Sequence, residues 1–150
     1  MIKYKILSSI SLLFWLLLII ILSSQNGTDT AQTSYKISSF VSKLFYNNAN
    51  ISDIKSVDFV IRKIAHIVLF FGLGFSITLF GFAFFIEMID FKFLVLISVV
   101  LSVLTAFLDE WRKQFIVGRH FDIYESMINI GSAIVGVAFM YLFHKFFSGE

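Results

Sequence analysis

Two groups of polar side chains in this sequence could bind an anion. They are Arg62, Lys63 and His66 in the first group, and Asp109, Glu110, Arg119, Glu125 and Asn129 in the second. Arginine and lysine donate strong hydrogen bonds to phosphate and carboxylate, and neighbouring carboxylates fix the geometry of a guanidinium. The combination predicts a polar pocket for an anionic headgroup. Ion pairs that only fasten the ends of helices are the alternative interpretation.

Long apolar runs must position these groups. Charged residues are costly in hydrocarbon, so uncharged stretches mark membrane spans, and a spanning helix needs about 20 residues. We predict spans over residues 6–24, 63–86, 91–109 and 124–145. The third stretch is short, so Asp109 and Glu110 are expected at its interface with the headgroups.

Composition indicates a membrane protein and argues against several other classes. Hydrophobic residues make up 58% of the 150 residues and charged residues only 15%, whereas soluble domains have about 25% charged residues. The net charge of +2 gives no reason to expect nucleic-acid binding. Without cysteine and with three scattered histidines, we expect no metal site, and we expect no cofactor. We predict an all-α membrane protein with four transmembrane helices, forming one domain over residues 1–150.

The loop after the first span has the pattern of a short amphipathic helix. Its apolar residues recur at helical spacing, with serines and a lysine on the opposite side. They are Ile37, Phe40, Val41, Leu44 and Phe45. Such a helix can lie on the membrane or pack against the bundle, and the sequence leaves both open. Further on, Asn50 followed by Asp53 predicts the cap of a second helix that leads into the second span.

Four spans place both polar groups at the same end of the bundle. The first and third loops must emerge on one side of the membrane, because two spans lie between them. At that end we predict ion pairs of Glu125 with Arg119 and of Asp109 with Arg62, since ionisable groups near the membrane usually pair.

The basic residues before the first span indicate its orientation. Lys3 and Lys5 favour a cytoplasmic N-terminus, which puts the polar end of the bundle outside. The apolar core is longer than that of a typical signal peptide and no A-x-A-like site follows it, so we expect an uncleaved span.

Three segments resemble motifs of the VanZ-like family of bacterial integral membrane proteins. Ser23-Ser24-Gln25-Asn26-Gly27, at the end of the first span, resembles the first motif. Arg62-Lys63-Ile64-Ala65-His66 resembles the second, a basic pair and a histidine entering the second span. Asp109-Glu110-Trp111 through Gly118-Arg119, followed by Glu125 and Asn129, resembles the third. The resemblance covers nearly the whole chain in the right order.

The chain also departs from the pattern of that family. Leu69 stands where the family commonly has glutamate, and Lys113 stands where it commonly has glutamine. Val117 replaces a usual proline, and Glu125 replaces a usual aspartate. The resemblance therefore indicates a diverged member, and the missing glutamate and glutamine bear on any activity that requires them.

The leading functional hypothesis is a non-catalytic protein of the bacterial plasma membrane. It would bind an anionic lipid or a lipid-linked envelope precursor through Arg62, Lys63, His66 and Arg119, because polar groups gather at one end. The resemblance implies a role in the cell envelope and a link to tolerance of teicoplanin-type glycopeptides. We assign no catalytic residue, since the sequence contains no Gly-x-Ser-x-Gly or His-Glu-x-x-His motif.

Two other classes of function are kept as alternatives. In a membrane enzyme acting on a lipid-linked substrate, the acid and base would be Asp109, Glu110 and Glu125, assisted by His66. In a structural subunit, pairs of small residues would let helices approach closely, either inside the bundle or in a homo-oligomer. These pairs are Gly72 with Ser76 and Ser132 with Gly136.

Overall fold

The chain folds as a bundle of helices. The computed structural model describes residues 2–45 and 50–148, and these residues contain no strand. The elements are α1 (Ile2–Ser23), α2 (Gly27–Phe45), α3 (Ile51–Phe85), α4 (Phe91–Arg112), a short 3-10 helix (Lys113–Phe115) and α5 (Ile123–Ser148). The predicted all-α fold with an extra helix in the first loop is confirmed.

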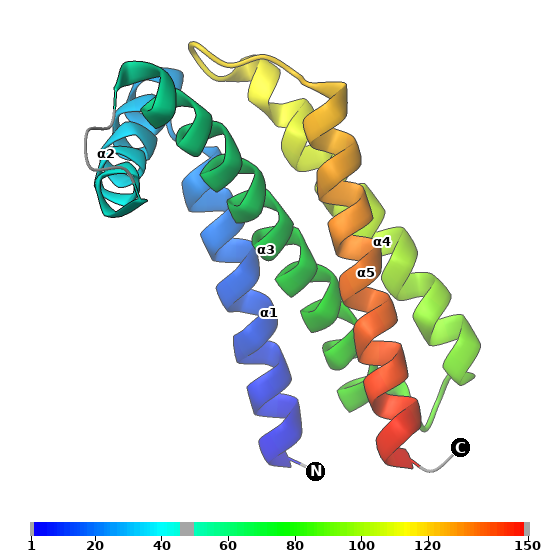
Figure 1. The fold of residues 1–150 in the computed structure, drawn as a ribbon. Coiled ribbons are helices and arrows are strands. Elements are labelled where there is room, and N and C mark those ends of the chain that lie inside the picture. Colours follow the sequence, from blue (N-terminus) through cyan, green and yellow to red (C-terminus); the bar gives the residue numbers. More distant parts are fainter. Residues whose placement is uncertain (1, 46–49, 149–150) are drawn as a thin grey trace.

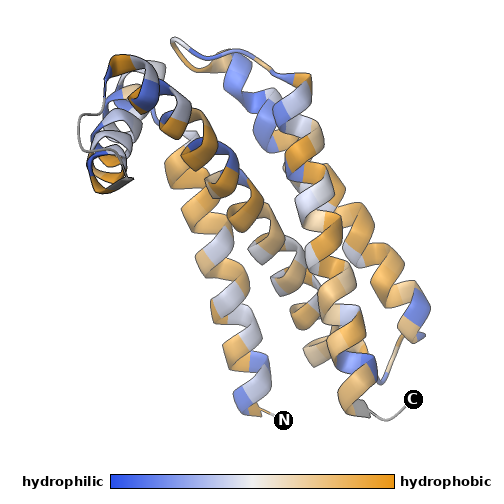
Figure 2. Cartoon of the chain, in the orientation of Figure 1, coloured by the Kyte–Doolittle hydropathy of each residue, from blue (hydrophilic) through white to orange (hydrophobic). Residues whose placement is uncertain are grey.

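Four of the helices can cross a membrane. The segments Ile2–Ser23, Ile51–Phe85, Phe91–Phe115 and Ile123–Phe147 have the length and apolar composition of membrane spans. They run side by side with alternating direction, so that both chain ends lie at the same end of the bundle (Figure 1). Hydrophobic residues cover most of their length, whereas hydrophilic residues gather at the opposite end (Figure 2). Because many large apolar side chains point outward, the bundle is built to face lipid, as in a multi-pass membrane protein.

Helix α3 is one continuous element of 35 residues. Its predicted cap is confirmed: the Asn50 side chain accepts a hydrogen bond from the Asp53 N–H at 3.0 Å. The Asp53 carboxylate accepts one from the Asn50 N–H at 3.0 Å in return, which completes a capping box. The capped segment is therefore the start of the spanning helix itself, and no separate helix leads into it.

Helix α2 packs through its polar side. Ser34, Ser38 and Ser42 are buried, and the hydroxyls of Ser34 and Ser38 donate hydrogen bonds to the carboxylate of Asp58 on α3. Ile37 and Phe40, on the predicted apolar side, are exposed, as is Leu44. The side chain of Phe45 lies outside the described part of the structure. The helix thus contacts the bundle and still presents an apolar face outward, which combines the two arrangements that the sequence left open.

The middle of the bundle is held by close approach of helices. Buried side chains from four helices form its core: Ile19, Phe70, Leu73, Ala106 and Ala133. Gly72 lies directly under the indole ring of Trp15, and Gly136 lies against the backbone of Phe71. These small residues therefore serve packing inside the bundle, one of the two uses predicted for them.

Candidate functional site

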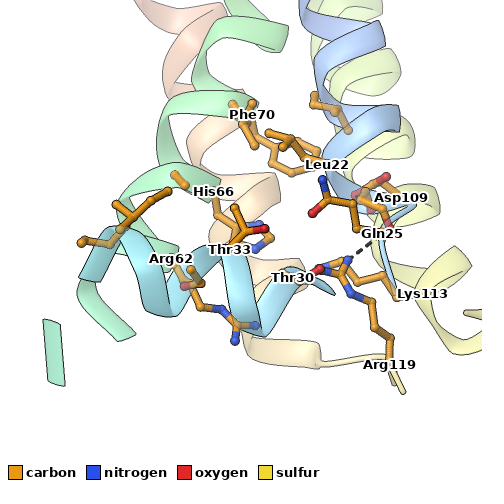
Figure 3. Close-up of a pocket in the computed structure, with 17 residues that line it drawn as sticks. Leu22, Gln25, Thr30, Thr33, Arg62, His66, Phe70, Asp109, Lys113 and Arg119 are labelled. Carbon is orange, nitrogen blue, oxygen red and sulfur yellow. Dashed lines mark hydrogen bonds between the residues drawn. The ribbon is translucent and has the colours of Figure 1, made fainter. Parts of the chain in front are cut away.

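Two adjoining cavities open at the polar end of the bundle. The first, of about 180 Å³, lies among α1, α2 and α3 and is lined by apolar side chains that include Ile19, Leu22, Leu69 and Phe70. The second, of about 340 Å³, is mostly polar and extends toward Gly118, His120, Asp122 and Glu125. Both are lined by Thr30, Arg62, His66, Lys113 and Arg119, so these residues mark the boundary between them. Figure 3 shows the first cavity, with Phe70 and Leu22 at one end and Arg62 and Arg119 at the other.

Arg119 is held at this boundary by neutral partners. Its Nη1 donates to the backbone oxygen of Ser23 at 3.1 Å, and its Nη2 donates to the Thr30 hydroxyl at 2.8 Å. Burial lowers the pKa of Arg119, and the positive charge of Arg62 lowers it further. An arginine stays charged under such a shift, so the site holds a guanidinium that has no carboxylate within ion-pair distance among the described residues.

Arg62 completes a pair of guanidinium groups. It lies on α3, lines both cavities and makes neither a hydrogen bond nor an ion pair with any described residue. Two like charges near one another repel, and an anion placed between them would remove that repulsion. The boundary of the two cavities therefore favours a negatively charged group.

A buried ion network lies behind the two arginines. Lys113 Nζ donates to Glu110 at 2.6 Å and to Glu125 at 3.1 Å. Lys63 Nζ donates to the other oxygen of Glu125 at 3.2 Å. Glu110 is 0% exposed and Lys113 is 4% exposed, so their charges are shielded from water. Such a pair holds together only because each charge is compensated by the other.

The amide of Asn129 links His66 to this network. Asn129 Nδ2 donates to Glu110 at 3.2 Å, because an ionised carboxylate only accepts hydrogen bonds. Its Oδ1, which lies 3.0 Å from His66 Nδ1, must then accept the Nδ1–H. A neutral His66 therefore carries its proton on Nδ1, and its Nε2 is an acceptor. Nε2 lies 3.7 Å from Glu125, which lines the polar cavity.

Asp109 has partners other than the predicted one. Its carboxylate accepts a hydrogen bond from the Ser23 hydroxyl at 2.9 Å and pairs with Arg112 at 3.4 Å. The predicted pairing of Asp109 with Arg62 is therefore wrong. The predicted pairing of Glu125 with Arg119 is also wrong, because Glu125 pairs with Lys63 and Lys113. Each carboxylate has a cation that the fold brings close, and this leaves both arginines for other partners.

The structure divides the eight predicted site residues into two sets. Those that line a cavity are Arg62, His66, Asp109, Arg119 and Glu125. Lys63, Glu110 and Asn129 line neither cavity and hold the others in place. Glu110 therefore cannot reach a ligand in these cavities as the acid or base of the enzyme alternative.

Sequence reasoning missed several residues of the site. Lys113 joins two carboxylates and lines both cavities, although it figured only as a departure from the family pattern. Its position three residues after Glu110 on a helix was an available signal, since such pairs share a helix face. Of the two neutral partners of Arg119, Ser23 begins the first segment that resembles the family, whereas Thr30 carries no comparable signal. No three histidine, aspartate or glutamate side chains in the described part of the chain are grouped as metal ligands.

Comparison with known proteins identifies the family. A model of the VanZ/LLP1 family matches residues 9–144, which is nearly the whole chain. The chain belongs to this family. No curated protein and no solved structure gives a significant match.

The three VanZ-like segments of the chain meet at the two cavities. Ser23 of the first segment binds both Asp109 and Arg119 of the third. His66 of the second segment binds Asn129, which follows the third. Segments with 34 and 42 residues between them in the sequence thus build a single site in this VanZ/LLP1 protein.

Proposed function

We propose that this VanZ/LLP1 protein binds an anionic lipid or a lipid-linked precursor of the bacterial cell envelope at its two adjoining cavities. The observation that carries the proposal is their shared boundary, where an apolar cavity meets a polar one at Arg62 and Arg119. A molecule with an apolar chain and an anionic headgroup has the same division. The site lies in a bundle of membrane-spanning helices, and molecules of this kind surround such a bundle.

The charge balance supports an anionic headgroup. Asp109 pairs with Arg112, and Glu110 and Glu125 pair with the lysines. The two arginines at the boundary have no such partner in the described structure. Arginine presents a planar fork of donors that matches phosphate and carboxylate oxygens.

Lipid binding tests the proposal directly. Purified protein should bind phosphatidylglycerol in preference to phosphatidylcholine, measured by lipid retention in native mass spectrometry. The double variant Arg62→Ala/Arg119→Ala should weaken that binding by about tenfold or more, because hydrogen bonds to charged groups contribute about 1.5–3 kcal/mol each. The matched control is Lys36→Ala/Lys55→Ala, which removes two exposed charges on α2 and α3 away from the cavities. Equal retention by both double variants would contradict the proposal.

We place the polar end of the bundle outside the cytoplasm, with the N-terminus inside. Lys3 and Lys5 support this orientation, and it would let the site meet envelope precursors on which glycopeptides such as teicoplanin act.

Cysteine labelling measures the orientation, because the chain has no native cysteine. Single cysteines at the exposed positions Lys36, Met88 and Val117 can be treated with a membrane-impermeant thiol reagent on intact cells. We expect labelling at positions 36 and 117 and none at position 88, which lies in the hairpin at the other end. Labelling at position 88 alone would reverse the orientation and remove the link to glycopeptide tolerance.

A further inference from the structure

We infer that the headgroup bound here is a terminal phosphate, a phosphate monoester on a single apolar chain, in preference to the phosphodiester of an ordinary phospholipid. The inference rests on the proposed function, since it names the class of lipid that the same two cavities would take. Four features of the boundary between the cavities carry it: its charge, its free donors, its imidazole acceptor and the size of the apolar cavity.

The charge at the boundary suits more than one negative charge. Lys63, Arg112 and Lys113 are each paired with a carboxylate, which leaves Arg62 and Arg119. One further carboxylate lines the polar cavity, that of Asp122. Asp122 lines only the polar cavity, where it accepts hydrogen bonds from N–H groups of the first turn of α5 at 2.8 and 3.3 Å, so its charge lies outside the boundary that the two arginines share. A monoester carries about −1.5 to −2 at pH 7, whereas a phosphodiester carries a single charge.

The free donors of the two arginines match three oxygens better than two. Arg119 uses one N–H for Ser23 and one for Thr30, which fixes the side chain and leaves its remaining N–H groups available. Arg62 has all of its donors free among the described residues. A terminal phosphate offers three non-bridging oxygens, so each guanidinium can bind in a bidentate manner, while a phosphodiester offers only two.

His66 adds an acceptor that only a monoester can use fully. The hydrogen bond to Asn129 holds the proton of a neutral His66 on Nδ1, so Nε2 keeps its lone pair and lies 3.7 Å from the Glu125 carboxylate. The ring lines both cavities beside the two arginines. A monoester exchanges between a doubly charged form and a singly charged form with a P–OH. The singly charged form can donate that hydrogen to Nε2, and a phosphodiester has no such hydrogen. The charged groups that face the ring are Lys63, Lys113 and Glu125, which are already paired with one another.

The apolar cavity has room for one chain. Its volume is about 180 Å³, and an apolar protein cavity of about 150 Å³ holds a single benzene. Ile19 and Phe70, both buried in the core, line this cavity. The apolar cavity therefore suits one chain beside the headgroup, which is what a single-chain lipid phosphate presents.

A matched pair of probes tests the inference. The whole protein, in phosphatidylcholine nanodiscs, is titrated with dodecyl phosphate and with methyl dodecyl phosphate, which has the same chain on a phosphodiester. Empty nanodiscs correct for partition into the bilayer. We expect dodecyl phosphate to bind at least tenfold more tightly. We expect His66→Gln to reduce the difference in affinity between the two probes and Arg62→Ala/Arg119→Ala to abolish it. The unfolding temperature of each variant checks that it is folded.

Other outcomes separate this inference from the proposed function. Equal binding of the two dodecyl probes, with phosphatidylglycerol still bound, would overturn the inference and leave the proposed function standing. Failure of every anionic lipid to bind would overturn both. If inorganic phosphate alone binds as tightly as dodecyl phosphate, the site takes the free anion and the single-chain lipid is excluded.

Discussion

Replacement of Lys113 by methionine is expected to lower the free energy of unfolding by about 3–5 kcal/mol. The ammonium group lies 2.6 Å from a carboxylate of Glu110 that is 0% exposed. Methionine fills a similar volume but leaves that carboxylate without a cation, and an uncompensated buried charge is strongly unfavourable. The measurement is unfolding of the purified protein in mixed micelles, followed by circular dichroism.

The double variant Glu110→Gln/Lys113→Met is the control. Once both charges are gone, most of the lost stability should return, because the cost arises from the unpaired charge. Glu110→Gln alone should cost less than Lys113→Met, since Lys113 keeps its second partner, Glu125, at 3.1 Å. A double-mutant cycle measures the coupling between the two positions. Strictly additive effects would show that the pair contributes nothing to the fold.

The spans could be predicted from the sequence because hydrocarbon excludes unpaired charge. The predicted third span ended at residue 109, whereas α4 continues to Arg112. The difference has a physical cause. Asp109 and Glu110 remain in the helix because Ser23 donates a hydrogen bond to Asp109 and Lys113 forms an ion pair with Glu110. The charge pattern of a sequence marks which part of a helix can face lipid. It does not show where a polar partner allows the helix to continue past a charged residue.

The partners within the site could not be predicted in the same way. The number of spans was enough to place Arg62 and Arg119 at one end of the bundle. The pairing of Arg112 with Asp109 follows a spacing of three residues on α4, which the sequence shows. The contact of Asp109 with Ser23 on α1 depends instead on the rotation of α4 about its axis, which no spacing in the sequence fixes. Ser23, in the first segment that resembles the family, and Thr30 both hold Arg119, but they are uncharged residues of common types, so nothing in the sequence assigns them to Arg119.

The sequence likewise did not predict which face of α2 packs against the bundle. Its apolar residues identified an amphipathic helix, and in a soluble protein that face would turn inward. Here Asp58 of α3 accepts hydrogen bonds from Ser34 and Ser38, so the serine face turns inward and Phe40 stays exposed. The reversal follows from the membrane surroundings, because lipid receives an apolar face at no cost, whereas the half-buried carboxylate of Asp58 needs hydrogen-bond donors.

Substitution of Gly136 by alanine is expected to lower the free energy of unfolding by about 1–3 kcal/mol, the usual cost of overpacking. A β-carbon at this position would lie 2.1 Å from the carbonyl oxygen of Phe71 on α3. The obstacle is backbone, so no side chain can rotate away, and α3 and α5 would have to separate. Helices α3 and α5 approach each other equally closely at a second point, where a β-carbon at Gly74 would lie 2.0 Å from the carbonyl oxygen of Ala133.

Gly131, on the same helix, provides the matched control for Gly136. A β-carbon there meets nothing within 4 Å, and the position is exposed. Gly131→Ala should therefore leave stability unchanged or raise it by up to about 1 kcal/mol through helix propensity. Thermal unfolding in detergent compares the two variants. Because Gly136 lies between helices of one chain, loss of a homo-oligomer on its substitution would report a disturbed bundle. Equal stability of the two alanine variants would instead mean that α5 does not approach α3 at Gly136.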